Sequence, residues 1–206
     1  MNKNLSDKVI HRLTLYHCIL IDYINDNVEF ISSSQIAKLL HIDDSQVRKD
    51  ISLLNKSGKS RVGYTVKELM ASIQESLGYN RKKNAYIVGA GYLGSALANY
   101  GKFSHCGLNI VAAFDNDQSK VGTMVNNIAV RDINELPEFV EKTNIDIAIL
   151  TVPRVYGQIA TDFLIEEAKV KYIWNFTPRI LNVPAGIHVW NENLMANFIQ
   201  FTYKIK

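Results

Sequence analysis

One continuous stretch, Ala85-Tyr-Ile-Val-Gly-Ala-Gly-Tyr-Leu-Gly94, decides the fold class of this chain. Its four apolar residues predict a buried strand, and a Gly-x-Gly-x-x-Gly pattern follows directly, before a helix predicted over 95–100. In this pattern Gly89 allows a tight turn, Gly91 lets backbone amides approach a pyrophosphate, and Gly94 lets helix and strand pack closely. The free N–H groups at the helix N-terminus attract phosphate. The stretch therefore predicts a Rossmann dinucleotide-binding domain.

A carboxylate at the spacing typical of this fold strengthens the prediction. A second apolar strand over 110–114 ends in Asp115, which lies 21 residues beyond Gly94. A carboxylate in this place accepts from both ribose hydroxyls and repels a 2′-phosphate, so NADH/NAD+ is favoured over the 2′-phosphorylated cofactors. The following loop, which contains Lys120, is expected either to flank the adenosine or to be a plain surface turn.

Strands and helices continue to alternate toward the C-terminus. Helices are predicted over 136–141 and 157–168, and strands over 145–152, 172–176 and 187–190. Because the C-terminal ends of parallel strands border the ligand crevice, two strand ends are expected to surround the nicotinamide half, with plain turns as the alternative. The predicted cofactor-binding residues are Gly89, Ala90, Gly91, Tyr92, Leu93, Gly94, Asp115, Lys120, Thr151, Val152, Pro153, Asn175 and Phe176, with Pro178 close by.

The part of the chain before this domain is predicted to be helical. An amphipathic helix is expected over 6–25, a shorter one after the capping serines 32–34, and a third that Asp43 and Asp44 can cap. Two short helices joined by a tight turn have the layout of a helix-turn-helix, in which the second helix enters the major groove of DNA.

Two further signs favour a winged helix. The segment 59–64 is short, basic and partly β-prone, which suits a wing beside the recognition helix. Thr65-Val-Lys-Glu68 is expected to form a capping box that opens a fourth helix, and Gly78 is expected to end that helix as a C′ glycine.

The charge distribution also favours DNA binding by this part. The formal net charge is only +3, yet residues 45–67 hold six basic side chains against Asp50 alone. Such an excess attracts phosphate backbones, although a solvated helix face is the alternative. Gln and Ser side chains hydrogen-bond base edges, and Arg binds a guanine edge or a phosphate. The predicted DNA-binding residues are Ser45, Gln46, Arg48, Lys49, Ser52, Lys56, Lys59 and Arg61.

Composition bears on compartment and assembly. With 47% hydrophobic and 21% charged residues, the 206-residue chain has ordinary globular proportions. No apolar run approaches the roughly 18 residues of a membrane span, and charged residues occupy the place of a secretory signal. Cys18 and Cys106 are too few and too far apart to suggest a zinc site. We expect a cytoplasmic protein without metal or membrane contact. A helix over 194–205 is apolar on both faces, so a partner subunit is expected to cover it, with plain core as the alternative.

Nearly the whole chain resembles the Rex family of bacterial redox-sensing transcriptional repressors. The matching segments are Ser45-Gln-Val-Arg-Lys-Asp-Ile-Ser52, Gly58, Val62-Gly-Tyr64, Leu77-Gly78, Val88-Gly-Ala-Gly-Tyr-Leu-Gly94, Ala98-Asn-Tyr100, Phe114-Asp115, Lys120-Val-Gly122, Thr151-Val-Pro153, Gln158, Asn175-Phe-Thr-Pro178 and Val183-Pro184. The resemblance implies a homodimer whose winged helices bind a palindromic operator and whose C-terminal helix is exchanged between subunits. It also implies that NADH releases the DNA, while NAD+ competes and permits binding.

The expected fold class is therefore α/β with three parts. These are a winged helix-turn-helix DNA-binding domain (1–80), a Rossmann NAD(H)-binding domain (81–191) and a C-terminal dimerisation helix (192–206) that is exchanged between subunits.

Four residues bear on the switch that the resemblance implies, which is the release of DNA when NADH binds. Family members commonly pair an Arg of the first helix with an Asp just before the last helix, across subunits. Here Cys18 and Asn193 stand in those places, Leu194 replaces the aromatic residue that follows, and Tyr100 is kept. The wing also differs from the family pattern, since its Arg61 is displaced by one position, and Asn55 stands where Gly is frequent. A divergent paralogue that binds DNA with little or no redox response is therefore an open alternative.

The rival class is a small NAD-dependent oxidoreductase. Against it, about eighty residues form the basic helical part, which leaves no separate substrate domain. None of the five histidines lies beside a Lys, Tyr or Asp at a spacing that suggests hydride-transfer chemistry, and only His188 could face the crevice. We therefore expect no enzymatic activity.

Overall fold

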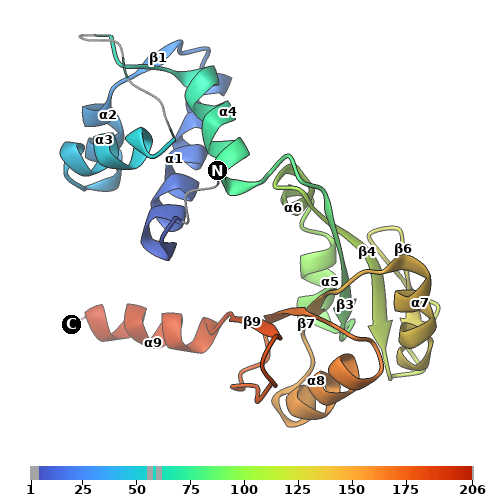
Figure 1. Cartoon of the computed structure of the whole chain (residues 1–206). Coiled ribbons are helices and arrows are strands. Elements are labelled where there is room, and N and C mark those ends of the chain that lie inside the picture. Colours follow the sequence, from blue (N-terminus) through green and yellow to red (C-terminus); the bar gives the residue numbers. More distant parts are fainter. Residues whose placement is uncertain (1–4, 55–57, 59–61, 206) are drawn as a thin grey trace. The chain divides into compact units, whose positions relative to one another are not determined.

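Separate hydrophobic cores divide the chain into two units. The computed structural model describes residues 5–54, 58 and 62–205, with one unit up to Arg81 and the other from Lys82 (Figure 1). Lys56, Lys59 and Arg61, predicted to contact DNA, lie outside the described residues.

The described residues of the first unit form four helices and a two-stranded sheet. In chain order its elements are α1 (Asp7–Asn25), β1 (Phe30–Ile31), α2 (Ser33–Leu40), α3 (Asp44–Ser52), β2 (Tyr64–Thr65) and α4 (Val66–Leu77). Leu20, Ile36, Val47 and Ile73 are fully buried in one core, so all four helices contribute to it. The helices α2 and α3 with the turn between them confirm the predicted helix-turn-helix.

Local caps explain where these helices begin and end. Ser32 accepts from the Gln35 N–H in a complete capping box, and Asp43 accepts from the Ser45 N–H. Gly78 ends α4 in the left-handed conformation with φ +74°, as predicted.

The predicted capping box at the start of α4 is wrong. The Thr65 side chain makes no cap hydrogen bond. Thr65 instead pairs with Phe30 in the β1–β2 sheet, and the Val66 N–H donates to the Glu29 carbonyl at 2.9 Å. The neighbouring segment therefore satisfies the first free amide of the helix.

The second unit is built on a seven-stranded sheet with the order β5-β6-β4-β3-β7-β8-β9. Its strands are β3 (Lys83–Val88), β4 (Leu108–Asp115), β5 (Met124–Val125), β6 (Ile128–Asp132), β7 (Ile147–Leu150), β8 (Tyr172–Asn175) and β9 (His188–Asn191). Its helices are α5 (Tyr92–Ala98), α6 (Lys102–His105), α7 (Leu136–Thr143), α8 (Gly157–Glu166) and α9 (Leu194–Lys204). Only β5 pairs antiparallel among the described strands. The six parallel strands have the Rossmann order, with the first strand, β3, beside the fourth, β7.

Alternating side chains of β3 place helices on both faces of this sheet. Tyr86 and Val88 join a core with α7 and α8, whereas Ala85 and Ile87 join a core with α5. Figure 1 shows α5 and α7 on opposite sides of the sheet. This arrangement explains why the strand reads as a continuous apolar run.

Some boundaries differ from the predictions, and several elements were not predicted, among them the β5–β6 hairpin and α6. Helix α5 begins three residues early, because Gly91 is its N-cap, and β7 ends at Leu150 rather than 152. The β5–β6 hairpin turns at Asn126-Asn127, both with positive φ, and asparagine is among the residues that favour such turns. The Asn-Asn dipeptide is the sequence signal from which this hairpin could have been predicted. We found no such signal for the short helix α6.

Candidate dinucleotide and DNA sites

The three fingerprint glycines have different roles in the structure. At Gly89, φ is +102°, and an added Cβ would lie 3.0 Å from the Thr151 carbonyl carbon. At Gly94 it would lie 2.0 Å from the Gly89 carbonyl oxygen, so this close packing of helix on turn requires glycine. At Gly91 it would meet no atom within 4 Å. Gly91 therefore leaves open space where a ligand's pyrophosphate can approach the backbone.

A side-chain hydrogen bond joins the ends of β3 and β7. The Thr151 hydroxyl donates to the Gly89 carbonyl at 2.7 Å. Gly89 follows β3, and Thr151 follows β7, so the bond spans the point at which the strand order reverses. This is where Rossmann domains bind their ligands.

Asp115 organises the loop that borders this point. It is 5% exposed, and its Oδ2 accepts from the Ala90 N–H at 2.7 Å and from Lys120 Nζ at 3.0 Å. Its Oδ1 accepts from the Asp117 N–H at 2.9 Å. The hydrogen bond to Asp115 raises the pKa of Lys120. Because a carboxylate offers about four acceptor positions, only one remains free here. The carboxylate therefore has one acceptor position open for a further donor, whereas the prediction of two ribose hydroxyls requires two.

The side-chain amide of Asn175, predicted to contact the cofactor, is fully engaged within the protein. It is fully buried, and its Nδ2 donates to the Arg179 carbonyl and to Asn191 Oδ1. Its Oδ1 accepts from the N–H and the hydroxyl of Thr177. These four bonds use the whole hydrogen-bonding capacity of the amide, so none is left for a ligand.

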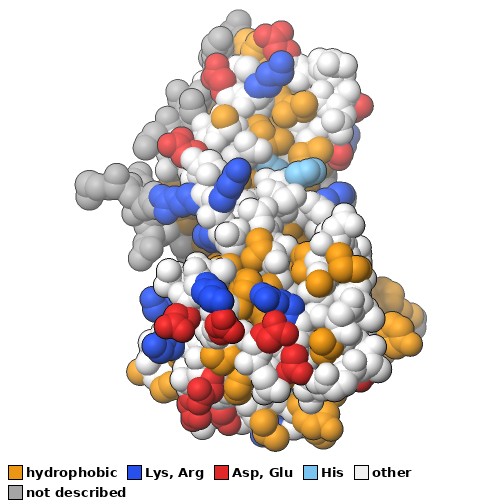
Figure 2. Space-filling view, turned by 90° about the vertical axis from the view of Figure 1, so that its right-hand side faces the viewer, with side chains coloured by type: hydrophobic (Ala, Val, Ile, Leu, Met, Phe, Trp, Pro, Cys, Tyr) orange, Lys and Arg blue, Asp and Glu red, His pale blue; other side chains and the backbone are white. Residues whose placement is uncertain are grey.

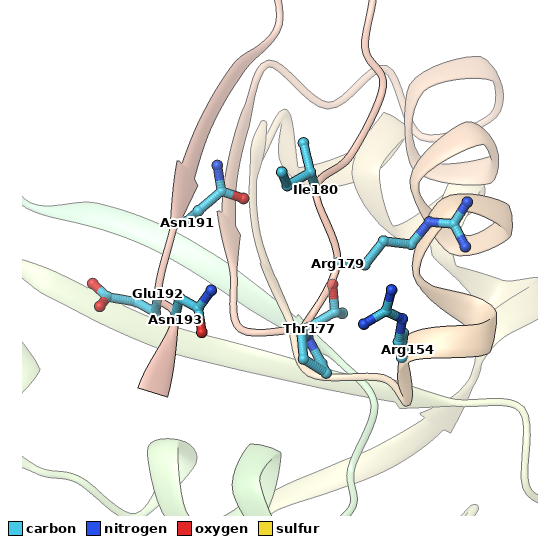
Figure 3. Close-up of a pocket in the computed structure, with 8 residues that line it drawn as sticks. Arg154, Thr177, Arg179, Ile180, Asn191, Glu192 and Asn193 are labelled. Atoms are coloured by element: carbon cyan, nitrogen blue, oxygen red, sulfur yellow. The ribbon is translucent and has the colours of Figure 1, made fainter. Parts of the chain in front are cut away.

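A cavity of about 550 Å³ lies at the C-terminal ends of β7, β8 and β9 (Figure 3). Its lining residues are Arg154, Thr177, Pro178, Arg179, Ile180, Asn191, Glu192 and Asn193. Figure 3 shows Arg154 and Arg179 on one side, while the Glu192 carboxylate points away from both. That carboxylate accepts from the indoles of Trp174 and Trp190, each at 3.1 Å. The sequence prediction reached the neighbouring Thr151–Pro153 and Phe176 but missed the two arginines.

The predicted switch residues lie in different surroundings. The Tyr100 ring packs edge-on against Phe103 at 4.8 Å and is half exposed. Asn193 is the N-cap of α9, where its Oδ1 accepts from the Ala196 N–H at 2.9 Å, and the exposed Leu194 follows it. Cys18 is exposed on α1 in the first unit.

Helix α9 has no buried residue. Its exposed large apolar side chains are Leu194, Met195, Phe198, Ile199, Phe201 and Tyr203, and Ile205 follows them. These apolar side chains are therefore exposed in this structure and are not part of a core.

Five of the eight predicted DNA-binding residues lie on α3. Arg48, Lys49 and Ser52 are exposed, and Ser45 and Gln46 are partly exposed. Arg48 forms a bidentate pair with Asp44 one turn earlier. In contrast, Figure 2 shows acidic and basic side chains intermingled on the visible face of the second unit.

A buried network behind α3 was missed by the sequence analysis. Asp50 is 1% exposed, and it accepts from Arg12 Nε at 2.6 Å, Arg12 Nη2 at 2.8 Å, the Tyr16 hydroxyl at 2.8 Å and Gln46 Nε2 at 2.9 Å. Burial alone would raise the pKa of Asp50, but these hydrogen bonds outweigh it and lower the pKa below its usual value. The sequence signal for this network was Asp50 itself, an acidic residue in the middle of the basic segment 45–67.

Membrane and metal features were searched among residues 5–54, 58 and 62–205. No helix in these ranges could cross a bilayer, and they contain no cluster of three or more His, Cys, Asp or Glu side chains suited to a metal ion.

Two family models match the chain. One is described as the CoA binding domain and covers residues 80–179. The other is described as the putative DNA-binding protein N-terminus and covers residues 4–52.

Curated relatives match almost end to end. The chain is 36% identical over 204 residues to the redox-sensing transcriptional repressor Rex of Clostridium botulinum strain Eklund 17B, covering 99% of this chain and 97% of the relative. It is 38% identical over 200 residues to the protein of that name from strain Hall, covering 97% and 95%.

Solved structures agree with these relatives. RSP in complex with β-NAD+ and operator DNA has a TM-score of 0.89 and 32% identity, covering 98% of this chain and 93% of that chain. RSP in complex with β-NADH has a TM-score of 0.87 and 33% identity, covering 98% and 95%. RSP is described as a Rex-family repressor. The resemblance expected from the sequence is thus confirmed, and the chain belongs to the Rex family of redox-sensing transcriptional repressors.

Proposed function

We propose that this protein is a dimeric repressor that binds operator DNA through its first unit and NADH or NAD+ through its second. NADH binding releases the dimer from a palindromic operator. The observation that carries the proposal is the glycine fingerprint at the point of strand reversal, in one chain with a helix-turn-helix. A full-length relative, RSP, has been crystallised with NAD+ and operator DNA and also with NADH.

The cofactor site suits a dinucleotide. The pyrophosphate would approach the backbone at Gly91, where an added Cβ meets no protein atom. Asp115 would accept from a ribose hydroxyl, and Lys120 would keep that carboxylate in place. The nicotinamide half would extend from Thr151–Pro153 toward the cavity beside Phe176 and Arg154.

The DNA site is centred on α3. Its exposed Arg48 and Lys49 would bind phosphates or guanine edges, and its N-terminal residues Ser45 and Gln46 would face the bases. Two such helices, one from each subunit, match a palindrome only when they reach successive major grooves.

Dimerisation would involve α9, whose apolar side chains have no cover among the described residues. A second copy that accepts this helix would bury them. If the NADH-bound dimer no longer matches adjacent grooves, the two ligands must oppose each other. A coupling of about 1–3 kcal/mol, or 5–150-fold in affinity, is typical of such linkage.

We place the protein in the cytoplasm, where operator DNA is accessible, and propose no catalytic activity. His188, the histidine nearest to a catalytic position by sequence, stacks on the Tyr172 ring at 5.3 Å. This contact gives its ring a packing role.

A second candidate is a paralogue that binds DNA without a strong redox response. It is favoured by Asn193, an uncharged residue already engaged in capping α9, at the place where the family commonly has Asp. This candidate predicts that NADH leaves the operator affinity unchanged.

One experiment separates the candidates. Gel retardation on a palindromic operator, with NADH and NAD+ titrated separately and CoA as a control ligand, should show release by NADH alone at low concentration. Unchanged retardation would favour the paralogue. If NADH fails to act, Asn193→Asp with Cys18→Arg should restore the response, because the pair reintroduces the charged partners that the family commonly has.

A further inference from the structure

Several outward side chains of α3 already have hydrogen-bond partners within the protein. The Arg48 guanidinium is paired with Asp44, and the Ser52 hydroxyl donates to the Lys49 carbonyl at 2.7 Å. Gln46 lies in the first turn of α3, from which recognition helices contact base edges, and its Nε2 donates to Asp50 Oδ1 at 2.9 Å. The orientation of this amide therefore affects which bases the helix can recognise.

The orientation of the Gln46 amide is dictated by its partner. An ionised carboxylate accepts hydrogen bonds and donates none, so the nitrogen rather than the oxygen of the amide must face Asp50. Asp50 cannot rotate to a different arrangement without loss, because Arg12 and Tyr16 hold its remaining acceptor positions. A flipped Gln46 would place two oxygens against each other at a buried charge.

The opposite end of the same amide is free. Among the described residues, no hydrogen-bond partner is found for Gln46 Oε1, and the side chain is only partly buried. A glutamine free to flip presents either a donor or an acceptor to a base. Held as it is here, Gln46 keeps its oxygen, an acceptor, in a fixed place, and the second N–H of the same amide stays available as a donor.

We propose that Gln46 reads the operator as a fixed acceptor and selects a base that carries an exocyclic amine in the major groove. This inference rests on the proposed DNA-binding function. Adenine offers N6 and cytosine offers N4, whereas guanine and thymine present O6 and O4, which would face the Gln46 oxygen. Asp50 acts as a positioning residue, since it touches no base and fixes the amide.

The first test identifies the base. Selection of binding sites from a randomised palindrome, with the wild type and with Gln46→Ala, should reveal one position per half-site whose preference is lost in the variant. Wild-type protein should select adenine or cytosine there. Thr14→Ala is the matched control, because Thr14 is exposed on α1 and its hydroxyl bonds only the Ile10 carbonyl.

The second test uses wild-type protein and altered DNA, so it does not depend on how a variant folds. At the identified position, purine replaces adenine, or 2-pyrimidinone replaces cytosine, which removes only the amine. We expect a loss of about tenfold in affinity, within the range for a single base contact. The two replacements distinguish adenine from cytosine as the source of the amine.

The outcomes separate this inference from the proposed function. Wild-type protein that binds no duplex would contradict DNA binding itself. Wild-type protein that binds, but selects guanine or thymine at the Gln46-dependent position, would overturn the fixed-acceptor inference alone. So would an unchanged affinity after removal of the amine, or an unchanged base preference in Gln46→Ala.

Discussion

Asp50 in α3 and Arg12 in α1 form a bidentate ion pair, with contacts of 2.6 and 2.8 Å between residues 38 apart in sequence. The pair fixes the proposed recognition helix to the longest helix of its unit. Because the Tyr16 hydroxyl and Gln46 Nε2 complete the acceptor set of the carboxylate, α3 is held by polar as well as apolar contacts. This suits a helix whose outward side chains must be placed accurately.

Removing Arg12 should destabilise the first unit. Arg12→Met leaves the Asp50 charge buried without its main partner, and we expect a loss of about 2–3 kcal/mol, below the full cost for a buried pair because Arg12 is 23% exposed. Tyr16→Phe, which removes one hydrogen bond to the same carboxylate, should cost less. Urea unfolding followed by circular dichroism measures both. Equal stability of Arg12→Met and wild type would show that the pair contributes nothing.

Acid should weaken the same unit through Asp50. The pKa of Asp50 is lower in the folded chain than the ordinary value of about 3.9, so its ionised form stabilises the fold above that value. The stabilisation should be lost as the pH falls through the folded-state pKa. Unfolding free energies measured from pH 6 down to pH 2 should fall more steeply for wild type than for Asp50→Asn. Parallel curves would contradict this role.

The fingerprint glycines provide a matched pair of substitutions. Gly94→Ala would place a Cβ 2.0 Å from the Gly89 carbonyl, so it should lower the melting temperature and abolish NADH binding. Gly91→Ala meets no protein atom, so its melting temperature should stay close to that of the wild type while NADH binding weakens. Thermal unfolding and NADH fluorescence titration measure the two effects. Normal NADH affinity in Gly91→Ala would place the pyrophosphate elsewhere.

Asp115→Ala should weaken NADH binding for two reasons. It removes the proposed ribose acceptor, and it releases Lys120 and the Ala90 N–H from the hydrogen bonds that hold the loop. We expect at least a tenfold loss, about 1.4 kcal/mol, in fluorescence titration. Lys120→Met, which keeps the carboxylate, should lose less. An unchanged affinity in Asp115→Ala would refute the ribose role.

Arg48 and Asp44 should have opposite effects on DNA binding. Arg48→Ala should lower operator affinity and reduce the slope of log affinity against log salt by about one unit if Arg48 neutralises a phosphate. Asp44→Asn should raise affinity, because it frees the guanidinium and removes a negative charge near the DNA. Arg131→Ala is a control, since Arg131 is paired with Glu135 in the other unit. Retardation at several salt concentrations measures the slopes.

Features encoded by neighbouring residues could be predicted from the sequence. Gly89 and Gly94 follow from backbone geometry, and the Ser32 and Asp43 caps follow from the chemistry of helix ends. The same local logic failed at Thr65, whose side chain makes no cap hydrogen bond. Thr65 belongs instead to the β1–β2 sheet, a pairing that cannot be inferred from a four-residue pattern.

Contacts that depend on the three-dimensional fold could not be predicted from such local patterns. Asn175 resembles a ligand contact by its place at a strand end, yet the following loop and Asn191 of β9 occupy its amide. Arg154 and Arg179 face one cavity only because β7 and β8 are neighbours. Residue type indicated what each side chain can do, and topology determined with which partner it does so.

The exposed apolar surface of α9 also affects how the protein responds to dilution. Eleven residues are too few to remain helical in water unaided, so this segment needs a covering surface to keep its structure. If another copy supplies that surface, the helical content of the last residues will depend on protein concentration, and a single melting temperature will describe the molecule only when that concentration is stated.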